Sequence, residues 1–171
     1  MYDTERAVKD GLSPRLFFGD ASEYSPLRVI ELSGHERGCL ALLDTRTRTL
    51  LSGDAVQLYG ISRWGTGVSD IDGYFASLDL LRKADIEMLV TSHEYYPLGQ
   101  TAVGREAISR YLAASREALL ELIALVSASD ASPDETAKAI TEAKRKTEPN
   151  FPVQQVSTMK AIRKYLKSAV G

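Results

Sequence analysis

The chain contains only two histidines, and both follow apolar segments. His35 comes after a glycine, and His93 comes after the run Leu89–Ser92. Asp54 also follows a glycine, at the end of a further apolar segment. A neutral imidazole and a carboxylate are ligands that Zn²⁺ accepts, and a carboxylate can also bridge two ions. The three residues therefore predict a metal site, where bound Zn²⁺ would lower the pKa of water to about 7.

A structural role is the alternative for each histidine, because a neighbouring group readily satisfies a ring nitrogen. For either histidine alone, that alternative is the simpler one. Strand ends are rigid, however, and the loops beyond them can form a cleft. Three polar residues that follow strands, each beside a glycine or serine, therefore favour one shared site.

Three strands are expected around the first two of these residues. Leu27–Leu32 is rich in β-forming residues and precedes the loop that holds His35. Cys39–Leu43 and Thr49–Leu51 flank a polar turn, which predicts an antiparallel hairpin that ends beside Asp54. The continuous apolar character of the hairpin predicts burial on both faces, which requires a second covering layer.

The next segments alternate between loop, helix and strand. Gln57–Asp70 has no regular period and contains Trp64 among glycines, so it is expected to form a loop that shapes access to the site. Ile71–Lys83 places its apolar residues near one helical face. Met88–Thr91 is then expected to be the strand that leads to His93. This alternation predicts an α/β layer.

Helices are expected from about residue 101 onward. Apolar residues recur there at helical spacing, at Ile108, Leu112, Leu119, Ile123 and Val126. Ser132–Glu135 has the sequence of a capping box and predicts a helix that ends near Lys146. Ser157 is expected to cap a last helix through Val170. The basic residues of that helix form either a solvated surface or a surface for phosphate or nucleic acid, and they are Lys160, Arg163, Lys164 and Lys167.

The composition of the 171-residue chain is that of an ordinary globular protein, with 44% apolar and 26% charged residues. We expect one domain, with a β-sheet part over 1–100 and a helical part over 101–171. Residues 1–26 are expected to form loops, with a short helix near 5–9. A net charge of -2 argues against a nucleic-acid partner.

The single cysteine, Cys39, excludes an internal disulfide and is expected to be buried packing rather than a nucleophile. No apolar run is long enough to span a bilayer, so no membrane partner is expected. The N-terminus is charged and lacks a secretory signal. A cytoplasmic location is therefore expected.

The order of these motifs resembles the second half of the metallo-β-lactamase superfamily. The turn SGHERG at 33–38 and the hairpin that ends in SGD at 52–54 resemble that family's Gly-His-x-x-Gly turn and Gly-Asp hairpin end. The segment DGYFASLDLLRKADIEMLVTSHEYYPLG resembles the family's next helix, with its Tyr-x-x-Ser-Leu pattern, and the strand that delivers a last histidine. The resemblance implies that His35 and His93 bind different Zn²⁺ ions, or Fe or Mn ions. It also implies that Asp54 bridges the two ions as the catalytic carboxylate.

The family's first motif, His-x-His-x-Asp-His, does not occur in this chain. The resemblance therefore implies the second half of an αββα sandwich: a mixed or antiparallel sheet covered by helices, with a C-terminal helical extension. The site would normally draw ligands from both halves, so metal binding by this chain alone would be weak. An uncovered sheet face would be buried in a homodimer or against a missing N-terminal half.

Two functions from different classes follow. The first is a metal-dependent hydrolase that acts on a small-molecule ester, thioester, lactam or phosphoester through metal-bound hydroxide, with half of its active site in this chain. The second is a non-catalytic structural module that dimerises and binds metal weakly or not at all. A nucleic-acid-processing protein is a third interpretation, which only the basic residues of the last helix suggest.

Overall fold

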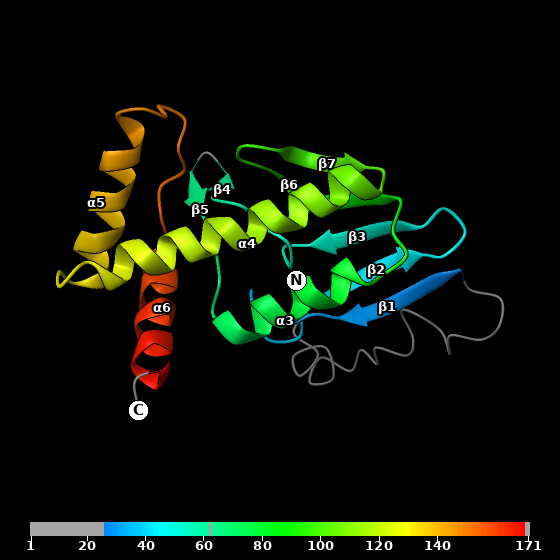
Figure 1. Ribbon diagram of the computed structural model, residues 1–171, viewed down its shortest axis with the longest axis horizontal. Helices are drawn as coiled ribbons and strands as arrows, with labels where there is room; N and C mark the ends of the chain where they lie inside the picture. Colours follow the sequence, from blue (N-terminus) through cyan, green and yellow to red (C-terminus); the bar gives the residue numbers. More distant parts are fainter. Residues whose placement is uncertain (1–25, 62, 170–171) are drawn as a thin grey trace, which may run out of the picture.

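The computed structural model describes residues 26–61 and 63–169, and the helix predicted near 5–9 lies outside them. Five of the described strands form one mixed sheet in the order β1-β2-β3-β6-β7. Helices cover this sheet on one side (Figure 1). The arrangement confirms the predicted α/β (α+β) architecture.

The strands combine an antiparallel unit with one parallel step. β1 (Leu27–Glu31), β2 (Leu40–Asp44) and β3 (Thr49–Gly53) are antiparallel neighbours, which confirms the predicted hairpin. β6 (Met88–Tyr95) runs parallel to β3, and β7 (Gly99–Val103) returns antiparallel to β6. The parallel step places the end of β3 beside β6, and both strands carry candidate site residues.

The sequence pattern does not predict β7. Ala102 is the one buried side chain of this strand, so the segment shows no alternation of apolar and polar residues. Its strand conformation comes instead from backbone pairing with β6.

Helices α3 (Ile71–Arg82) and α4 (Arg105–Ser127) lie across the same face of the sheet (Figure 1). α3 begins where the Asp70 carboxylate accepts a hydrogen bond from the backbone N–H of Gly73, at 3.1 Å. The core between these helices and the sheet consists of fully buried side chains, among them Leu50, Tyr74, Leu78, Leu89, Tyr111, Leu112 and Leu119.

α5 (Pro133–Arg145) packs beyond the end of α4 and confirms the predicted capping box (Figure 1). The Ser132 hydroxyl accepts a hydrogen bond from the backbone N–H of Glu135 at 3.3 Å. The Glu135 carboxylate accepts one from the backbone N–H of Ser132 at 2.9 Å. These bonds satisfy two backbone groups that the first turn of a helix leaves without partners.

α6 (Val156–Ala169) closes the described chain, and the prediction that Ser157 caps it is wrong. The helix begins one residue before Ser157, whose hydroxyl donates to the side chain of Gln155 at 3.3 Å. The serine therefore stands inside the first turn, where its own backbone is already helical.

A small hairpin interrupts the loop that the sequence predicts over 57–70. It consists of β4 (Gly60–Ile61) and β5 (Trp64–Gly65). A side chain at Gly60 would overlap the carbonyl oxygen of Trp64, so glycine permits the close pairing of the two strands.

No described helix covers the second face of the sheet (Figure 1). Val29, Leu42, Leu51 and Val90 occupy paired positions across four neighbouring strands. Val29 is 39% exposed and Leu51 is 46% exposed. The predicted burial of both faces is therefore wrong for the described part of the chain, which supplies a covering layer on one face.

Cys39 is buried, as predicted, with 1% exposure. Burial raises the pKa of its thiol, so the nucleophilic thiolate is disfavoured. Among residues 26–61 and 63–169, no helix combines the length and the apolar character that a membrane crossing requires.

Candidate metal centre

The structure brings the three candidate residues together, and each oxygen of the Asp54 carboxylate faces one histidine. Oδ2 lies 3.9 Å from His35 Nε2, and Oδ1 lies 3.5 Å from His93 Nε2. His35 follows β1 and Asp54 directly follows β3, as the sequence predicts. The three side chains thus converge although 58 positions separate the first from the last (93 minus 35).

The position of His93 corrects the expected end of its strand. β6 does not stop at residue 91 but continues through Tyr95. Its pairing with β7 shifts register between Val90 and Tyr95. Such an irregularity bends a strand and redirects its side chains, so His93 turns toward Asp54 from inside the strand rather than from its end.

Gly34 determines how the chain enters His35. Its φ is +119°, a conformation that L side chains rarely adopt, and an added Cβ would lie 2.5 Å from the Cα of Tyr74. Its carbonyl oxygen accepts hydrogen bonds from the backbone N–H groups of Ser69, at 2.8 Å, and Asp70, at 3.0 Å. The turn that carries His35 therefore rests directly on the first turn of α3.

The ring orientation of His35 follows from its contact with Gly67. Nδ1 lies 2.6 Å from the Gly67 carbonyl oxygen and 2.9 Å from the Gln57 amide nitrogen. Because the shorter contact is to a carbonyl, which can only accept, we assign the proton to Nδ1. The nearby Gln57 amide donates to the carbonyls of Asp54, at 2.7 Å, and Gly67, at 3.1 Å. In the neutral ring, Nε2 therefore directs its lone pair toward Asp54. A backbone carbonyl on the second ring nitrogen is a common feature of metal-binding histidines.

Helix α6 supports this arrangement from behind. The Thr158 hydroxyl accepts a hydrogen bond from the backbone N–H of Val68 at 3.1 Å and donates to the carbonyl of Thr66 at 2.5 Å. These two residues flank Gly67, where an added Cβ would lie 3.1 Å from His35 Nδ1. The C-terminal helix thus positions the carbonyl group that orients His35.

Two hydroxyl groups hold the Asp54 carboxylate. Tyr95 donates to Oδ1 at 2.6 Å, and Ser92 donates to the same oxygen. Burial alone would raise the pKa of Asp54, but the hydrogen bonds from Ser92 and Tyr95, with a smaller contribution from the two neighbouring imidazoles, outweigh it and lower the pKa. Burial and the adjacent carboxylate raise the pKa of Tyr95, which stays a hydrogen-bond donor. Asp54 is therefore ionised at neutral pH.

The distances can be compared with those of a zinc site. Two ligands on one tetrahedral Zn²⁺ lie roughly 3.3–3.6 Å apart, given metal–ligand distances of about 2.0–2.2 Å. The 3.5 Å between His93 and Asp54 matches this spacing, and the 3.9 Å between His35 and Asp54 requires a small closure. Among the described residues, no group of three or more His, Cys, Asp or Glu side chains is arranged to hold one ion. The donors therefore fit half of each metal shell, and the ligand roles of the three residues stay predictions.

A cavity of about 390 Å³ opens over these residues. Its lining includes Trp64, which lies in the segment that the sequence associates with access to the site. The sequence does not identify Gln57, Tyr95 or Gln155, which also line the cavity. Tyr95 stands two residues after His93, but β6 changes register between Val90 and Tyr95, so regular strand alternation does not identify it. The two glutamines reach the cavity through loop packing, which no local pattern reveals.

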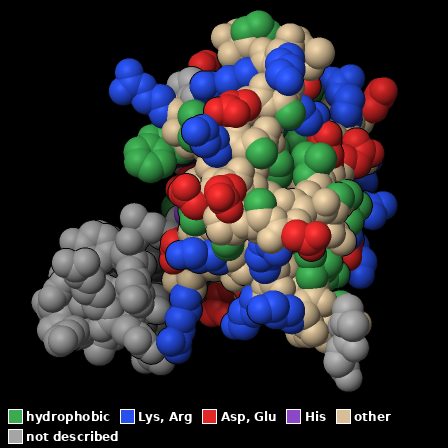
Figure 2. Space-filling view, turned by 90° about the vertical axis from the view of Figure 1, so that its left-hand side faces the viewer, with side chains coloured by type: hydrophobic (Ala, Val, Ile, Leu, Met, Phe, Trp, Pro, Cys, Tyr) green, Lys and Arg blue, Asp and Glu red, His purple; other side chains and the backbone are tan. Residues whose placement is uncertain are grey.

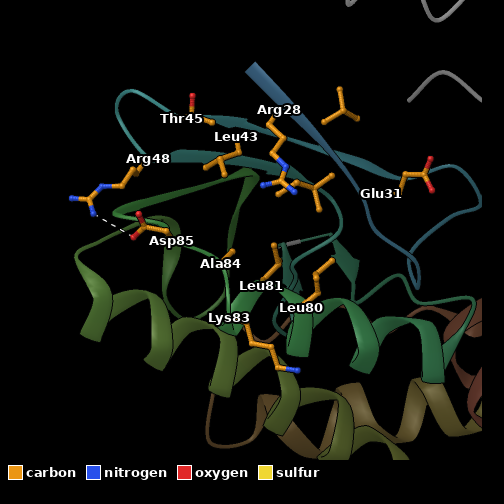
Figure 3. A pocket seen from close by; sticks show the side chains of 12 residues that line it. Arg28, Glu31, Leu43, Thr45, Arg48, Leu80, Leu81, Lys83, Ala84 and Asp85 are labelled. Atoms are coloured by element: carbon orange, nitrogen blue, oxygen red, sulfur yellow. Dashed lines mark hydrogen bonds and ion pairs between the residues drawn. The ribbon is translucent and has the colours of Figure 1, made fainter. Parts of the chain in front are cut away.

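A second cavity, of about 600 Å³, lies between the edge of the sheet and the C-terminal end of α3 (Figure 3). Arg28 and Lys83 border it, and Arg48 at its rim pairs with Asp85 at 3.3 Å (Figure 3). None of the described residues that line it is a histidine or a cysteine. Its lining carries three basic side chains, Arg28, Arg48 and Lys83, and two acidic ones, Glu31 and Asp85, and it is separate from the candidate metal centre.

The basic residues of α6, Lys160, Arg163, Lys164 and Lys167, line one cavity of about 450 Å³ together with Pro133, but they are not all free to bind a ligand. The Arg163 guanidinium donates to the carbonyls of Ser129, at 2.9 Å, and Ala131, so it holds the turn between α4 and α5. Figure 2 looks onto the end of the molecule that α5 and α6 form, and it shows Lys and Arg side chains interspersed with Asp and Glu. This distribution favours a solvated surface over a phosphate-binding one.

No protein-family model and no curated protein matches the chain. Among solved structures, a metallo-β-lactamase family protein from Thermus thermophilus matches with a TM-score of 0.54 and 18% identity, over 84% of this chain and 44% of that one. A double mutant of a sec-alkyl sulfatase matches with a TM-score of 0.48 and 16% identity, over 82% of this chain and 26% of that one. This chain thus spans less than half the length of either protein. The similarity shows the fold: the chain has part of the metallo-β-lactamase fold, which confirms the fold that the three motifs imply.

Proposed function

We propose that the chain is part of a metal-dependent hydrolase of the metallo-β-lactamase superfamily, in which His35, Asp54 and His93 are the metal ligands from this half of the active site. One observation carries the proposal: each oxygen of Asp54 faces Nε2 of a different histidine, at 3.9 and 3.5 Å. This is the arrangement expected of a carboxylate that bridges two ions. The fold match to a metallo-β-lactamase family protein supports it.

The chain's own residues have separate roles in this proposal. When bound, Zn²⁺, or Fe or Mn in its place, would activate a water molecule for attack on an ester, thioester, lactam or phosphoester. His35 offers Nε2 because the carbonyl of Gly67 holds its other ring nitrogen. Ser92 and Tyr95 orient Asp54 and keep it ionised. Among the described residues, only one histidine and Asp54 would face each ion, so the remaining ligands would come from another segment or another chain.

We propose that the uncovered apolar face of the sheet binds the part that brings those ligands. The row of Val29, Leu42, Leu51 and Val90 crosses four strands, and a stable interface buries about 800 Å² on each partner. The occupant is an N-terminal half of the fold or a second copy of this chain. Sedimentation of the chain, alone and mixed with a polypeptide that carries the first metal motif, distinguishes the two. Leu51→Lys should abolish either association.

A small-molecule substrate and a cytoplasmic location complete the proposal. The net charge of -2 and the mixed charges on α5 and α6 support a substrate other than nucleic acid (Figure 2). The single buried cysteine is compatible with a reducing compartment.

Zinc binding tests the ligand assignment directly. We expect added Zn²⁺ to raise the melting temperature of the 171-residue chain, because a ligand of the native state at about 100 times its Kd stabilises by about 2.7 kcal/mol. Asp54→Ala should remove the response and the bound zinc, while His35→Ala and His93→Ala should each remove part of both. Asp72→Asn, on the exposed first turn of α3, is the matched control. An Asp54→Ala variant that binds zinc as well as the parent would end the proposal.

The non-catalytic module is the second candidate, and the incomplete metal shell favours it. It predicts no zinc response in the chain alone and no hydrolysis when the first-half polypeptide is added. The hydrolase predicts that the mixture cleaves an ester or a lactam and that Asp54→Ala prevents this. Hydrolysis by the mixture would therefore exclude the module.

A further inference from the structure

The single tryptophan of the chain is exposed beside the candidate metal centre. Trp64 is 64% exposed and lines the same cavity of about 390 Å³ as His35, Asp54 and His93. Isolated apolar side chains are common on protein surfaces, but a large aromatic ring left in water at a functional cavity indicates a binding surface. The side chain is thus a candidate for contact with substrate.

The backbone beside Trp64 is firmly held, so its exposure is not that of a loose loop. The backbone N–H of Gly65 donates to the carbonyl of Val153 at 2.6 Å. The Gln155 amide donates to the Gly65 carbonyl, also at 2.6 Å. An added Cβ at Gly65 would lie 2.6 Å from the Cα of Gln154, so the two segments are in close contact. The backbone that follows Trp64 is therefore held in place, and binding against the Trp64 ring requires little ordering of that backbone.

The polar groups of the cavity are already engaged. The Gln57 amide donates to the carbonyls of Asp54 and Gly67. The Tyr95 hydroxyl donates to Asp54, and the Gln155 amide donates to a backbone carbonyl. Beyond the candidate metal ligands, the cavity thus presents mainly the apolar surfaces of its remaining side chains.

The charged side chains around the cavity also restrict which substrates it can bind. None of the described residues that line it is a lysine or an arginine. The cavity at the edge of the sheet is different, because Arg28, Arg48 and Lys83 border it (Figure 3). An anionic substituent on the substrate would lose its hydration beside the Asp54 carboxylate and find no lysine or arginine among the described residues of this cavity in exchange.

We propose that Trp64 and Ile61 bind an uncharged aromatic or apolar group of the substrate and place the adjoining bond beside His35, Asp54 and His93. This inference rests on the proposed hydrolase function, since it names the substrate class of that site. The class is a neutral ester, thioester or lactam with an aromatic or branched apolar group. Substrates that carry a further phosphate, sulfate or carboxylate group are excluded.

Trp64 reports on its own site, because no other tryptophan contributes to the emission of this chain. We expect methyl phenylacetate to shift the Trp64 emission to shorter wavelength in a saturable manner. Methyl acetate, which lacks the ring, and the phenylacetate anion, which carries a charge, should each bind at least about tenfold more weakly, a difference of about 1.4 kcal/mol. Equal or tighter binding of the anion would overturn the proposal.

Ligand-observed NMR extends the test to variants that lack the fluorophore. Trp64→Ala should weaken binding of methyl phenylacetate about tenfold, which is at the upper end of the range for one aromatic contact. Val103→Ala, which truncates a side chain that is 69% exposed and does not line the cavity, should leave binding unchanged. An emission that responds to protein concentration but to none of the three probes would show that Trp64 packs in an association surface, and the inference would fail.

These measurements are independent of turnover. If zinc binding and hydrolysis fail while ring-dependent binding persists, the apolar subsite stands and the hydrolase does not. If the zinc response depends on Asp54 but Trp64→Ala binds the aromatic ester as the parent does, the hydrolase stands and this inference does not.

Discussion

The Tyr74 hydroxyl links helix α3 to the candidate metal centre, and its removal has a calculable effect. It accepts a hydrogen bond from the backbone N–H of Gln57 and donates one to the carbonyl of the same residue, both at 2.9 Å. Tyr74 is 0% exposed, so no water replaces these bonds in Tyr74→Phe. Each backbone group left without a partner costs about 1–3 kcal/mol. We therefore expect Tyr74→Phe to lower the free energy of unfolding by roughly 2–6 kcal/mol.

Urea denaturation followed by circular dichroism measures this loss. In a chain of 171 residues, this loss corresponds to a fall in melting temperature of roughly 4–24 °C. The matched control is Tyr111→Phe: Tyr111 is 1% exposed, and its hydroxyl donates to one acceptor, the carbonyl of Gly99, at 2.8 Å. This control should cost about 1–2 kcal/mol. If Tyr74→Phe destabilises the chain no more than Tyr111→Phe does, the paired hydrogen bonds do not carry the assigned energy.

The substitution also tests the link to the site. The Gln57 side chain, on the same residue, holds the carbonyls of Asp54 and Gly67. We expect Tyr74→Phe to weaken zinc binding although residue 74 offers no metal ligand. If Tyr74→Phe destabilises the chain but leaves its zinc affinity unchanged, the Tyr74 hydroxyl stabilises the fold without positioning the metal ligands.

Three further predictions follow from particular contacts. Gly34→Ala should lower the free energy of unfolding by about 3 kcal/mol and remove the zinc response. The φ of +119° is strained for alanine, and the new Cβ meets the backbone of Tyr74. A melting temperature within a few degrees of the parent would contradict this prediction. Burial alone would raise the pKa of Glu121, but Lys144, at 2.7 Å, and the Tyr59 hydroxyl lower it below the ordinary 4.5. The ionised carboxylate therefore stabilises the fold fully above pH 4.5, and this stabilisation is lost as the pH falls through the lower folded-state pKa. Glu121→Gln should thus be less stable than the parent at neutral pH, with a difference that closes in acid denaturation curves; a constant difference would refute the assignment. Cys39, 1% exposed, should react with a thiol reagent at the rate of unfolding, and fast labelling of the native chain would show that it is accessible.

Local sequence signals predict the elements that carry the site. Gly34 and Gly53 each immediately precede a candidate ligand and have positive φ values of +119° and +57°. Glycine adopts such φ values readily, so both positions favour glycine for a conformational reason. The capping box at Ser132 is likewise confirmed, because its two hydrogen bonds involve residues only three positions apart. The local pattern fails for Ser157: α6 begins at Val156, and Thr158, the residue after Ser157, forms hydrogen bonds to residues 66 and 68.

Contacts between distant segments are what the sequence does not show. Ser92 and Tyr95 reach Asp54 because β3 and β6 are parallel neighbours and β6 changes register beyond Val90. Gly67 orients His35 across 32 positions in the chain. Neither relation has a periodic signature, because each depends on how whole strands and loops pack.

The sequence alone determined which residues can bind a metal, the strands that precede two of them, and the absence of the first histidine motif. These properties are local, since they follow from side-chain chemistry and from backbone preferences within a few positions. Only the tertiary structure decided that each Asp54 oxygen faces a different histidine, that Trp64 lines their cavity, and that one sheet face stays uncovered among the described residues. Those properties arise from the pairing order of the strands and from close packing, which join residues far apart in the chain.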